Sequence, residues 1–391
     1  MDTLTLTRGP HRALAGSPWV YRTELEALPA AAPGSLVRVK TWDGRIVGWG
    51  FYNPASMIAV RLLGRGDGLV DAASVVRQRV RDAWAWRQPL MGHRDAFRMI
   101  FSEADGLPGL VVDRYGPMLV VEVTSLGMDA YLDVVVETLV ELVHPEGIWE
   151  HGDLPVRARE GLPRVNRLLW GRLVTPVELT EHAVRLLVDV TGGQKTGHFL
   201  DQYENRGRVV AYAPEGSRVF DAFCHTGAFG LILAKQRGAE VVGIDIDPQA
   251  VRQASDNARL NGLEGRAVFR EENAFDWLRR ESDAGAQYDV GILDPPAFTK
   301  SKDSVPQALK GYKEINLRAL KLIRPGGYLI TSSCSYHVSE ADFIQVVQSA
   351  AYDARRFVRI VEIRGQGPDH PVLPALPESR YLKCLIVAVG Q

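Results

Sequence analysis

The chain has few cysteines and no long apolar run. Its three cysteines among 391 residues, Cys224, Cys334 and Cys384, share no CxxC spacing, so we expect neither a disulfide framework nor a metal site. No stretch approaches the roughly 18 consecutive apolar residues of a membrane span, and residues 1–8 lack the basic and apolar regions of a signal peptide. The sequence therefore predicts a cytoplasmic protein without a metal or a membrane segment.

Net charge is also small, and a value of −1 by itself disfavours nucleic-acid binding. The charge is uneven, however. Residues 1–100 hold 14 Lys+Arg and 8 Asp+Glu, whereas the remaining residues hold 32 and 39. Nearly all basic residues of the first part are arginines, which form forks with phosphate and stack on bases. This pattern indicates a basic, nucleic-acid-binding module joined to an acidic body, with an arginine-rich solvated surface as the alternative.

Three segments with different hydrophobic patterns predict three domains. Residues 1–72 read as short strands with a hairpin turn at Trp42-Asp-Gly-Arg45, typical of a small β-rich module. Residues 73–182 combine a helical period with a strand hairpin, which indicates an α+β domain. Over residues 183–391 strands alternate with helices, as in a doubly wound parallel sheet. The expected fold class is therefore α/β, with two smaller domains before the parallel sheet.

Glycine and acidic residues follow the first two strands of this predicted sheet. Gly227 and Gly230 come directly after the strand at 218–221, where a missing Cβ lets the backbone approach a ligand. Their spacing is not GxGxxG, which argues against a dinucleotide. Asp245 ends the second strand, a position from which an acid accepts hydrogen bonds from ribose hydroxyls. Asn273 follows the third strand and either recognises the adenine edge or caps a helix.

Two later strands end in a carboxylate and a thiol. Asp294 is followed by two prolines and Phe298, and Cys334 lies one strand further along the chain. Because the carboxyl ends of parallel strands meet at one edge, we expect both side chains in one crevice. A thiolate can add to an electrophilic ring, and an aromatic side chain can stack on a flipped base. The alternative for Cys334 is a small buried residue at a strand end.

Four motifs together resemble class I S-adenosylmethionine-dependent RNA methyltransferases, and most closely the bacterial large-subunit rRNA cytosine-5 methyltransferases. The motifs are DAFCHTGAFG from Asp221, GIDIDPQAV from Gly243, LDPPAFTKSK from Leu293 and TSSCS from Thr331. The likeness extends over nearly the whole chain. It implies a PUA-like RNA-binding domain at 1–72, a central α+β domain at 73–182 and a Rossmann-like methyltransferase domain at 183–391. It further implies S-adenosyl-L-methionine as cofactor and large-subunit rRNA or a ribosomal precursor as partner, and it leaves a homodimer open.

The resemblance also implies roles for individual residues. Cys334 and Asp294 would be catalytic, and Phe298, Lys300 and Lys302 would bind the substrate. The cofactor would be bound by residues of the strand ends and of a preceding glycine-rich segment: Lys195, Thr196, Gly197, Asp221, Phe223, Thr226, Gly227, Asp245, Asn273, Asp294 and Pro295. Addition of the Cys334 thiolate to carbon 6 of cytosine would activate carbon 5 for methylation. The base that removes the carbon-5 proton is unassigned, because Ala297 stands where another branch has a second cysteine.

Three other functions remain open at this point. The same Asp-Pro-Pro-x-Phe element resembles that of enzymes that methylate a base nitrogen, and these need no nucleophile. A non-catalytic RNA-binding assembly factor could retain the same fold. DNA could replace RNA as the substrate, since the basic module does not distinguish the two. The sequence identifies neither the cytidine nor whether naked RNA or an assembled subunit is modified.

Overall fold

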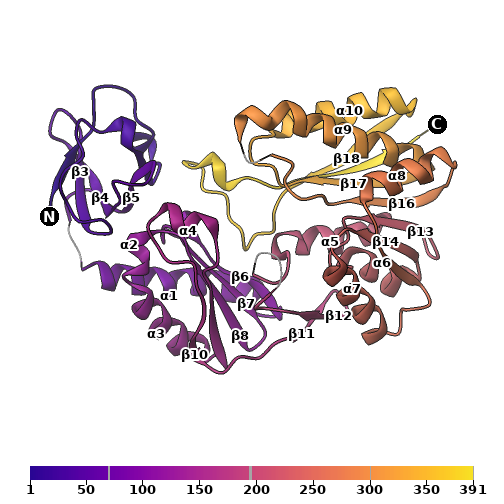
Figure 1. The fold of residues 1–391 in the computed structure, drawn as a ribbon, viewed down its shortest axis with the longest axis horizontal. Coiled ribbons are helices and arrows are strands. Elements are labelled where there is room, and N and C mark those ends of the chain that lie inside the picture. The colour runs from indigo at the N-terminus through magenta and orange to yellow at the C-terminus, as the bar shows by residue number, and fades with distance from the viewer. Residues whose placement is uncertain (69–70, 193–195, 300, 391) are drawn as a thin grey trace. The chain divides into compact units, whose positions relative to one another are not determined.

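The computed structural model describes residues 1–68, 71–192, 196–299 and 301–390 (Figure 1). Lys195 and Lys300, predicted to bind cofactor and substrate, lie outside the described residues. The chain forms two compact units. The first comprises Met1–Val177, Val188–Leu200 and Pro368–Ser379, and the second comprises Glu178–Leu187, Asp201–Gly367 and Arg380–Gln391.

The first unit begins with a five-stranded sheet in the order β1-β3-β4-β5-β2. The alternating pattern of the sequence explains β3, because Val37 and Val39 are buried in an apolar cluster while Leu36, Arg38 and Lys40 are less buried. The predicted hairpin turn at 42–45 joins β3 to β4. The strands are β1 (Thr3–Thr5), β2 (Trp19–Tyr21), β3 (Leu36–Lys40), β4 (Ile46–Tyr52) and β5 (Ile58–Arg65).

A second five-stranded sheet, in the order β10-β9-β8-β7-β6, completes the first unit together with four helices. Asp71 accepts a hydrogen bond from the Ser74 backbone N–H at 2.9 Å and so begins the long helix predicted after it. The strands are β6 (Ala96–Phe101), β7 (Leu110–Tyr115), β8 (Met118–Val123), β9 (Gly147–His151) and β10 (Asn166–Gly171). The helices are α1 (Ala72–Met91), α2 (Leu126–Asp129), α3 (Leu132–Val143) and α4 (Pro155–Arg159).

The segment between Gly152 and Arg167, although rich in glycine, proline and arginine, contains α4 and the start of β10. Tertiary contacts explain why this segment forms a helical turn. The buried Arg157 guanidinium donates to the carbonyls of Pro163 at 2.8 Å and Val123 at 2.7 Å, which holds the short helical turn in place. Local composition carries no signal for such distant contacts.

The second unit contains a seven-stranded sheet in the order β15-β14-β13-β16-β17-β19-β18. The first five of these strands are parallel, and β19 runs antiparallel to both β17 and β18. Apolar side chains cover both faces, with α6 and α7 on one face and α8, α9 and α10 on the other (Figure 1). This architecture confirms the predicted doubly wound α/β fold.

The bounds of its strands are β13 (Arg218–Ala222), β14 (Glu240–Asp245), β15 (Ala267–Glu271), β16 (Tyr288–Leu293), β17 (Ile323–Ser333), β18 (Val358–Arg364) and β19 (Lys383–Val389). Its helices are α5 (Tyr203–Val209), α6 (Ala228–Arg237), α7 (Pro248–Leu260), α8 (Ala274–Asp283), α9 (Val305–Leu322) and α10 (Glu340–Ala354). A separate two-stranded hairpin, β11 (Val177–Glu181) and β12 (Val184–Val188), precedes them. The carboxyl ends of β13, β14, β16 and β17 therefore share one edge of the sheet, where the predicted site residues lie.

No helix in the described part of the chain is both long and apolar enough to cross a membrane. Among the same residues, no three His, Cys, Asp or Glu side chains are grouped closely enough to hold a metal ion.

Candidate active site

The turn that follows β13 has an unusual backbone. Phe223, His225 and Gly227 have φ angles of 66°, 48° and 82°, in the left-handed region that favours glycine. A Cβ at Gly227 would lie 2.6 Å from the Phe269 ring, so only glycine fits there. The Cys224 N–H donates to the Ile244 carbonyl at 3.0 Å and fixes the turn against β14. The turn is therefore held at the sheet edge, at the start of α6, and its glycine makes room for the Phe269 ring.

Asp221 is a buried carboxyl directly below this turn. Its Oδ2 accepts a hydrogen bond from the Gly230 N–H at 3.0 Å, whereas its Oδ1 has no partner among the described residues. Burial raises the pKa of Asp221 to about 8; the nearby charges of Asp294 and Asp245 add to this effect, and the Gly230 N–H opposes it. A buried carboxyl oxygen without a partner is typical of a ligand-binding position, and a contact of Asp221 with the cofactor stays a prediction.

Asp245 and Asn273 end the neighbouring strands β14 and β15. The two carboxylate oxygens of Asp245 accept backbone N–H groups of His225 at 2.8 Å and Asp247 at 3.0 Å, which fixes the orientation of the carboxylate. The Asn273 side chain accepts the Phe275 N–H at 2.9 Å and caps α8, so the helix-cap interpretation of this residue is confirmed. Contacts of Asp245 and Asn273 with a nucleoside stay predictions.

Asp294 follows β16 and receives the end of a hydrogen-bond chain. The Arg364 guanidinium donates to Asn205 Oδ1 at 2.9 Å, and Asn205 Nδ2 donates to Gln202 Oε1 at 2.6 Å. Gln202 Nε2 then donates to Asp294 Oδ1 at 2.8 Å. Because a guanidinium can only donate, it fixes the direction of both amides. The chain thereby orients the Asp294 carboxylate as an acceptor.

Cys334 follows β17 and lies beside the exit of β16. Its Sγ is 3.8 Å from the Pro295 carbonyl oxygen, and the side chain is half-buried. The structure thus brings together Cys334, Asp294 and Pro295, as the strand-end argument predicts. Cys224 and Cys384 are buried, and burial raises the pKa of both thiols, that of Cys384 to about 12. These two cysteines have the features of core residues.

Phe298 and Lys302 lie on the segment after the Asp-Pro-Pro element. The Phe298 ring packs 4.5 Å from the Tyr312 ring, centroid to centroid, and 5.7 Å from that of Phe275. It belongs to a half-buried aromatic cluster that also includes Phe223. Lys302 is exposed. Roles for Phe298 and Lys302 in substrate binding stay predictions.

Thr196, Gly197 and Thr226 complete the predicted cofactor residues. Thr196 is buried within the first unit, where its hydroxyl donates to Asp113 at 2.5 Å and contacts the Tyr115 hydroxyl at 2.8 Å. Gly197 has a φ of 129° in the same unit. Thr226 is buried in the turn after β13, and its carbonyl accepts Asn257 Nδ2 at 3.1 Å. Their contacts with a cofactor stay predictions.

One functional candidate escaped the sequence analysis. Lys383 begins β19 and is only 4% exposed, and its ammonium donates to the carbonyls of Ser335 at 2.7 Å and Tyr381 at 2.8 Å. A single charge immediately before the apolar run Cys384–Val389 was the available signal.

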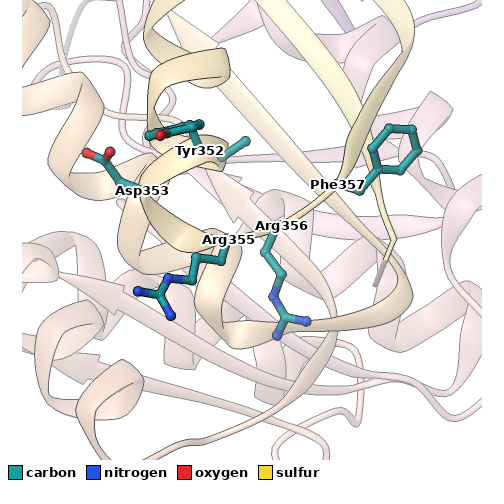
Figure 2. Close-up of a pocket in the computed structure, with 6 residues that line it drawn as sticks. Tyr352, Asp353, Arg355, Arg356 and Phe357 are labelled. Atoms are coloured by element: carbon teal, nitrogen blue, oxygen red, sulfur yellow. The ribbon is translucent and has the colours of Figure 1, made fainter.

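A pocket of about 750 Å³ lies away from these residues, at the end of α10 and the start of β18 (Figure 2). It is lined by Tyr352, Asp353, Arg355, Arg356 and Phe357, among others. Asp353 pairs with Lys313 at 2.7 Å, and Figure 2 shows the two arginines pointing away from Phe357. Since α10 begins at the edge that holds Cys334 and runs back across the sheet, its end lies at the opposite edge.

Known proteins match this chain in both sequence and fold. Residues 6–65 match the family model of a PUA-like domain, and residues 214–365 match that of a methyltransferase domain. A ribosomal RNA large subunit methyltransferase I of Shewanella denitrificans is 38% identical over 378 residues, which cover 95% of each chain. That of Aeromonas hydrophila is 36% identical over 396 residues, which cover 98% of each. The chain belongs to this family.

Solved structures agree on the fold. SMU.776, assigned as a methyltransferase and solved in complex with SAH, has a TM-score of 0.85 at 18% identity, and the match covers 99% of this chain and 100% of that one. The expected combination of a PUA-like domain with a Rossmann-like methyltransferase domain is therefore confirmed, and the cofactor is S-adenosylmethionine. The unpartnered Asp221 oxygen fits a ligand that carries hydrogen-bond donors.

Proposed function

We propose that this chain methylates carbon 5 of a cytosine in large-subunit ribosomal RNA, with Cys334 as the nucleophile. The observation that carries the proposal is the half-buried thiol, whose Sγ is 3.8 Å from the Pro295 carbonyl, at the strand end next to Asp294. The names of the two curated relatives support ribosomal RNA as the substrate. The excess of arginine in residues 1–100, which include the PUA-like domain, is consistent with phosphate contacts.

The proposed chemistry follows from the poor nucleophilicity of carbon 5. A bond forms between Cys334 Sγ and carbon 6, and the displaced ring electrons make carbon 5 an enamine nucleophile. S-adenosylmethionine supplies an electrophilic methyl group. After transfer, a base removes the carbon-5 proton, the electron pair restores the ring double bond, and the sulfur leaves as thiolate. Asp294, oriented by Gln202, would hold the pairing edge of the ring through this sequence.

The test compares Cys334→Ala with the unmodified chain, using rRNA from cells that lack this protein. We expect Cys334→Ala to abolish the appearance of 5-methylcytosine, measured by mass spectrometry of nucleosides, and to leave S-adenosylmethionine binding intact in calorimetry. Cys384→Ala is the matched control, because it removes a buried thiol from the neighbouring strand β19. Its methylation should persist.

Other outcomes favour the competing functions. Full methylation by Cys334→Ala, with the product on a base nitrogen, would favour direct nitrogen attack without an adduct. Absence of S-adenosylmethionine binding in the unmodified chain at millimolar cofactor would instead favour an RNA-binding assembly factor.

A further inference from the structure

Lys383 is a buried cation beside the proposed nucleophile. In the antiparallel pairing of β17 with β19, Lys383 is opposite Ser333, the residue before Cys334. Its ammonium donates to the carbonyl of Ser335, the residue after Cys334. Lys383 therefore contacts the chain on both sides of the cysteine and is 4% exposed.

The ammonium has no carboxylate partner within ion-pair distance among the described residues. Its two hydrogen bonds go to neutral carbonyls, those of Ser335 and Tyr381. Burying an ammonium without a counter-charge is unfavourable, because the ion loses its hydration and gains no opposite charge in return. A neutral side chain at this position of β19 would be more favourable for folding, so the charge itself points to a function.

We propose that Lys383 is a positioning residue whose ammonium stabilises the thiolate of Cys334. The inference rests on the proposed function only in taking Cys334 as the nucleophile. The thiolate is the reactive form of cysteine, and an adjacent cation favours it. Because the ammonium is held by carbonyls and not neutralised by a carboxylate, its field remains available to the sulfur.

The pKa of Lys383 reflects electrostatic coupling between its ammonium and Cys334. Burial lowers the pKa of Lys383 to about 8; the charge of Cys334 opposes this shift, as does that of Glu340, whereas Arg380 adds to it. Coupling between two sites is reciprocal, so the ammonium must favour the ionised thiol. With a pKa near 8, Lys383 is mostly protonated at pH 7 and loses its effect above pH 8.

Asp294, which follows the neighbouring strand β16, also lies beside Cys334, and a carboxylate there disfavours the thiolate. Other ionisable groups also lie near the pair. Tyr312 of α9 also feels the charge of Cys334, and burial raises its pKa, so it is a neutral phenol at pH 7. Glu340 at the start of α10 is paired with Arg380, 2.5 Å away, and these two charges offset each other. Among the described residues, Lys383 is therefore a cation near Cys334 that has no paired carboxylate.

A purely structural role for Lys383 would have a different signature. If the lysine only ties the 334–335 segment to β19 through the Ser335 carbonyl, its loss would lower thermal stability and leave the ionisation of the thiol unchanged. The pH profile of thiol reactivity separates the two roles. It requires neither RNA nor methyl transfer, so its failure is distinguishable from failure of the proposed function.

The experiment measures the reaction rate of the full-length protein with dithiodipyridine between pH 5 and 10. Cys334→Ser supplies the background of the buried Cys224 and Cys384 thiols. In the unmodified chain we expect the midpoint to lie below the value of about 8.5 of a free thiol. Lys383→Met should raise the midpoint by about one pH unit, which at pH 7 is about a tenfold loss of thiolate. Lys383→Arg, which keeps the charge, should leave the midpoint within about 0.3 units of the unmodified value.

Two results would overturn the proposal. One is an unchanged midpoint in folded Lys383→Met. The other needs no variant, and so remains available if Lys383→Met does not fold. A midpoint at or above about 8.5 in the unmodified chain would show that the ammonium does not outweigh burial and the Asp294 charge, so that the thiolate is not favoured over that of a free thiol, as the proposal requires.

Discussion

Replacing Asp221 by Asn should stabilise the ligand-free protein, and more so as the pH rises. The physical reason is burial: the Asp221 carboxyl is 1% exposed, one of its oxygens lacks a partner among the described residues, and its pKa is raised to about 8. Asn keeps an oxygen for the Gly230 N–H, which donates to Asp221 Oδ2, and carries no charge. Such a carboxyl is unfavourable for folding, and we expect it to be kept for its predicted contact with the cofactor.

The magnitude follows from proton linkage. Below about pH 4 the carboxyl is protonated in both the folded and the unfolded chain, and it contributes no difference. Between about pH 4 and pH 8 the unfolded chain releases the proton while the folded chain retains it, so stability falls by about 1.4 kcal/mol per pH unit. From pH 6 to pH 8 the loss is roughly 2–3 kcal/mol, and above pH 8 it levels off. For a unit of this size, that corresponds to roughly 5–10 °C in Tm.

Thermal unfolding of Asp221→Asn and the unmodified chain, both without cofactor, at pH 6 and pH 8 tests this. We expect the variant to have the higher Tm, with the gap several degrees wider at pH 8, and to bind S-adenosylmethionine more weakly. Glu362→Gln is the control, and the difference between its Tm and that of the unmodified chain should be equal at pH 6 and pH 8. Hydrogen bonding to Arg208 is the largest of the interactions that lower the pKa of Glu362 to about 2, so its small stabilisation is lost as pH falls below 4. A Tm gap for Asp221→Asn that is equal at both pH values would refute the reasoning.

Two further pairs of variants test the turn after β13 and the hydrogen-bond chain to Asp294. Gly227→Ala should lower the free energy of unfolding by about 2–4 kcal/mol, because of the φ of 82° and the 2.6 Å approach to Phe269, and should impair cofactor binding. Gly216→Ala is the control, because its φ is 65° but its Cβ would lie in open space; it should lower the free energy of unfolding by only about 1 kcal/mol and bind the cofactor normally. Denaturant titration measures the stability, and calorimetry measures the binding. Gln202→Glu should lower kcat/KM for methylation at least tenfold, because an acceptor oxygen would face Asp294 in place of the donating amide. Gln202→Leu should lose less than Gln202→Glu in the same steady-state assay, and equal losses would contradict the fixed direction of the chain.

Local patterns were enough to predict the parallel part of the sheet and the meeting of Asp294 with Cys334. Each strand is an apolar run that ends in a polar residue, and the rule that carboxyl ends share an edge places the two residues together without knowledge of the strand order. The bend after β13 was likewise predictable from its glycines. The hydrogen-bond chain that orients Asp294 was not, because its members Arg364 and Asn205 are separated by 159 positions and meet only through the fold.

The position of Lys383 beside Cys334 could not be predicted from the sequence, and the reason is the topology of the sheet. A strand that lay parallel to β17 would bring its last residue to the edge where Cys334 lies, and its first residue to the opposite edge. β19 is antiparallel, so its first residue, Lys383, arrives at the edge of the nucleophile. The next residue of β19, Cys384, points into the apolar core on the other face of the sheet. A charge two residues after Lys383 would face the same side as Lys383 but lie roughly 7 Å further from the sheet edge. Position 383 is thus the place on this strand from which a buried cation can reach the cysteine, and its register with Ser333 explains why a lysine is tolerated at the entrance of an apolar strand.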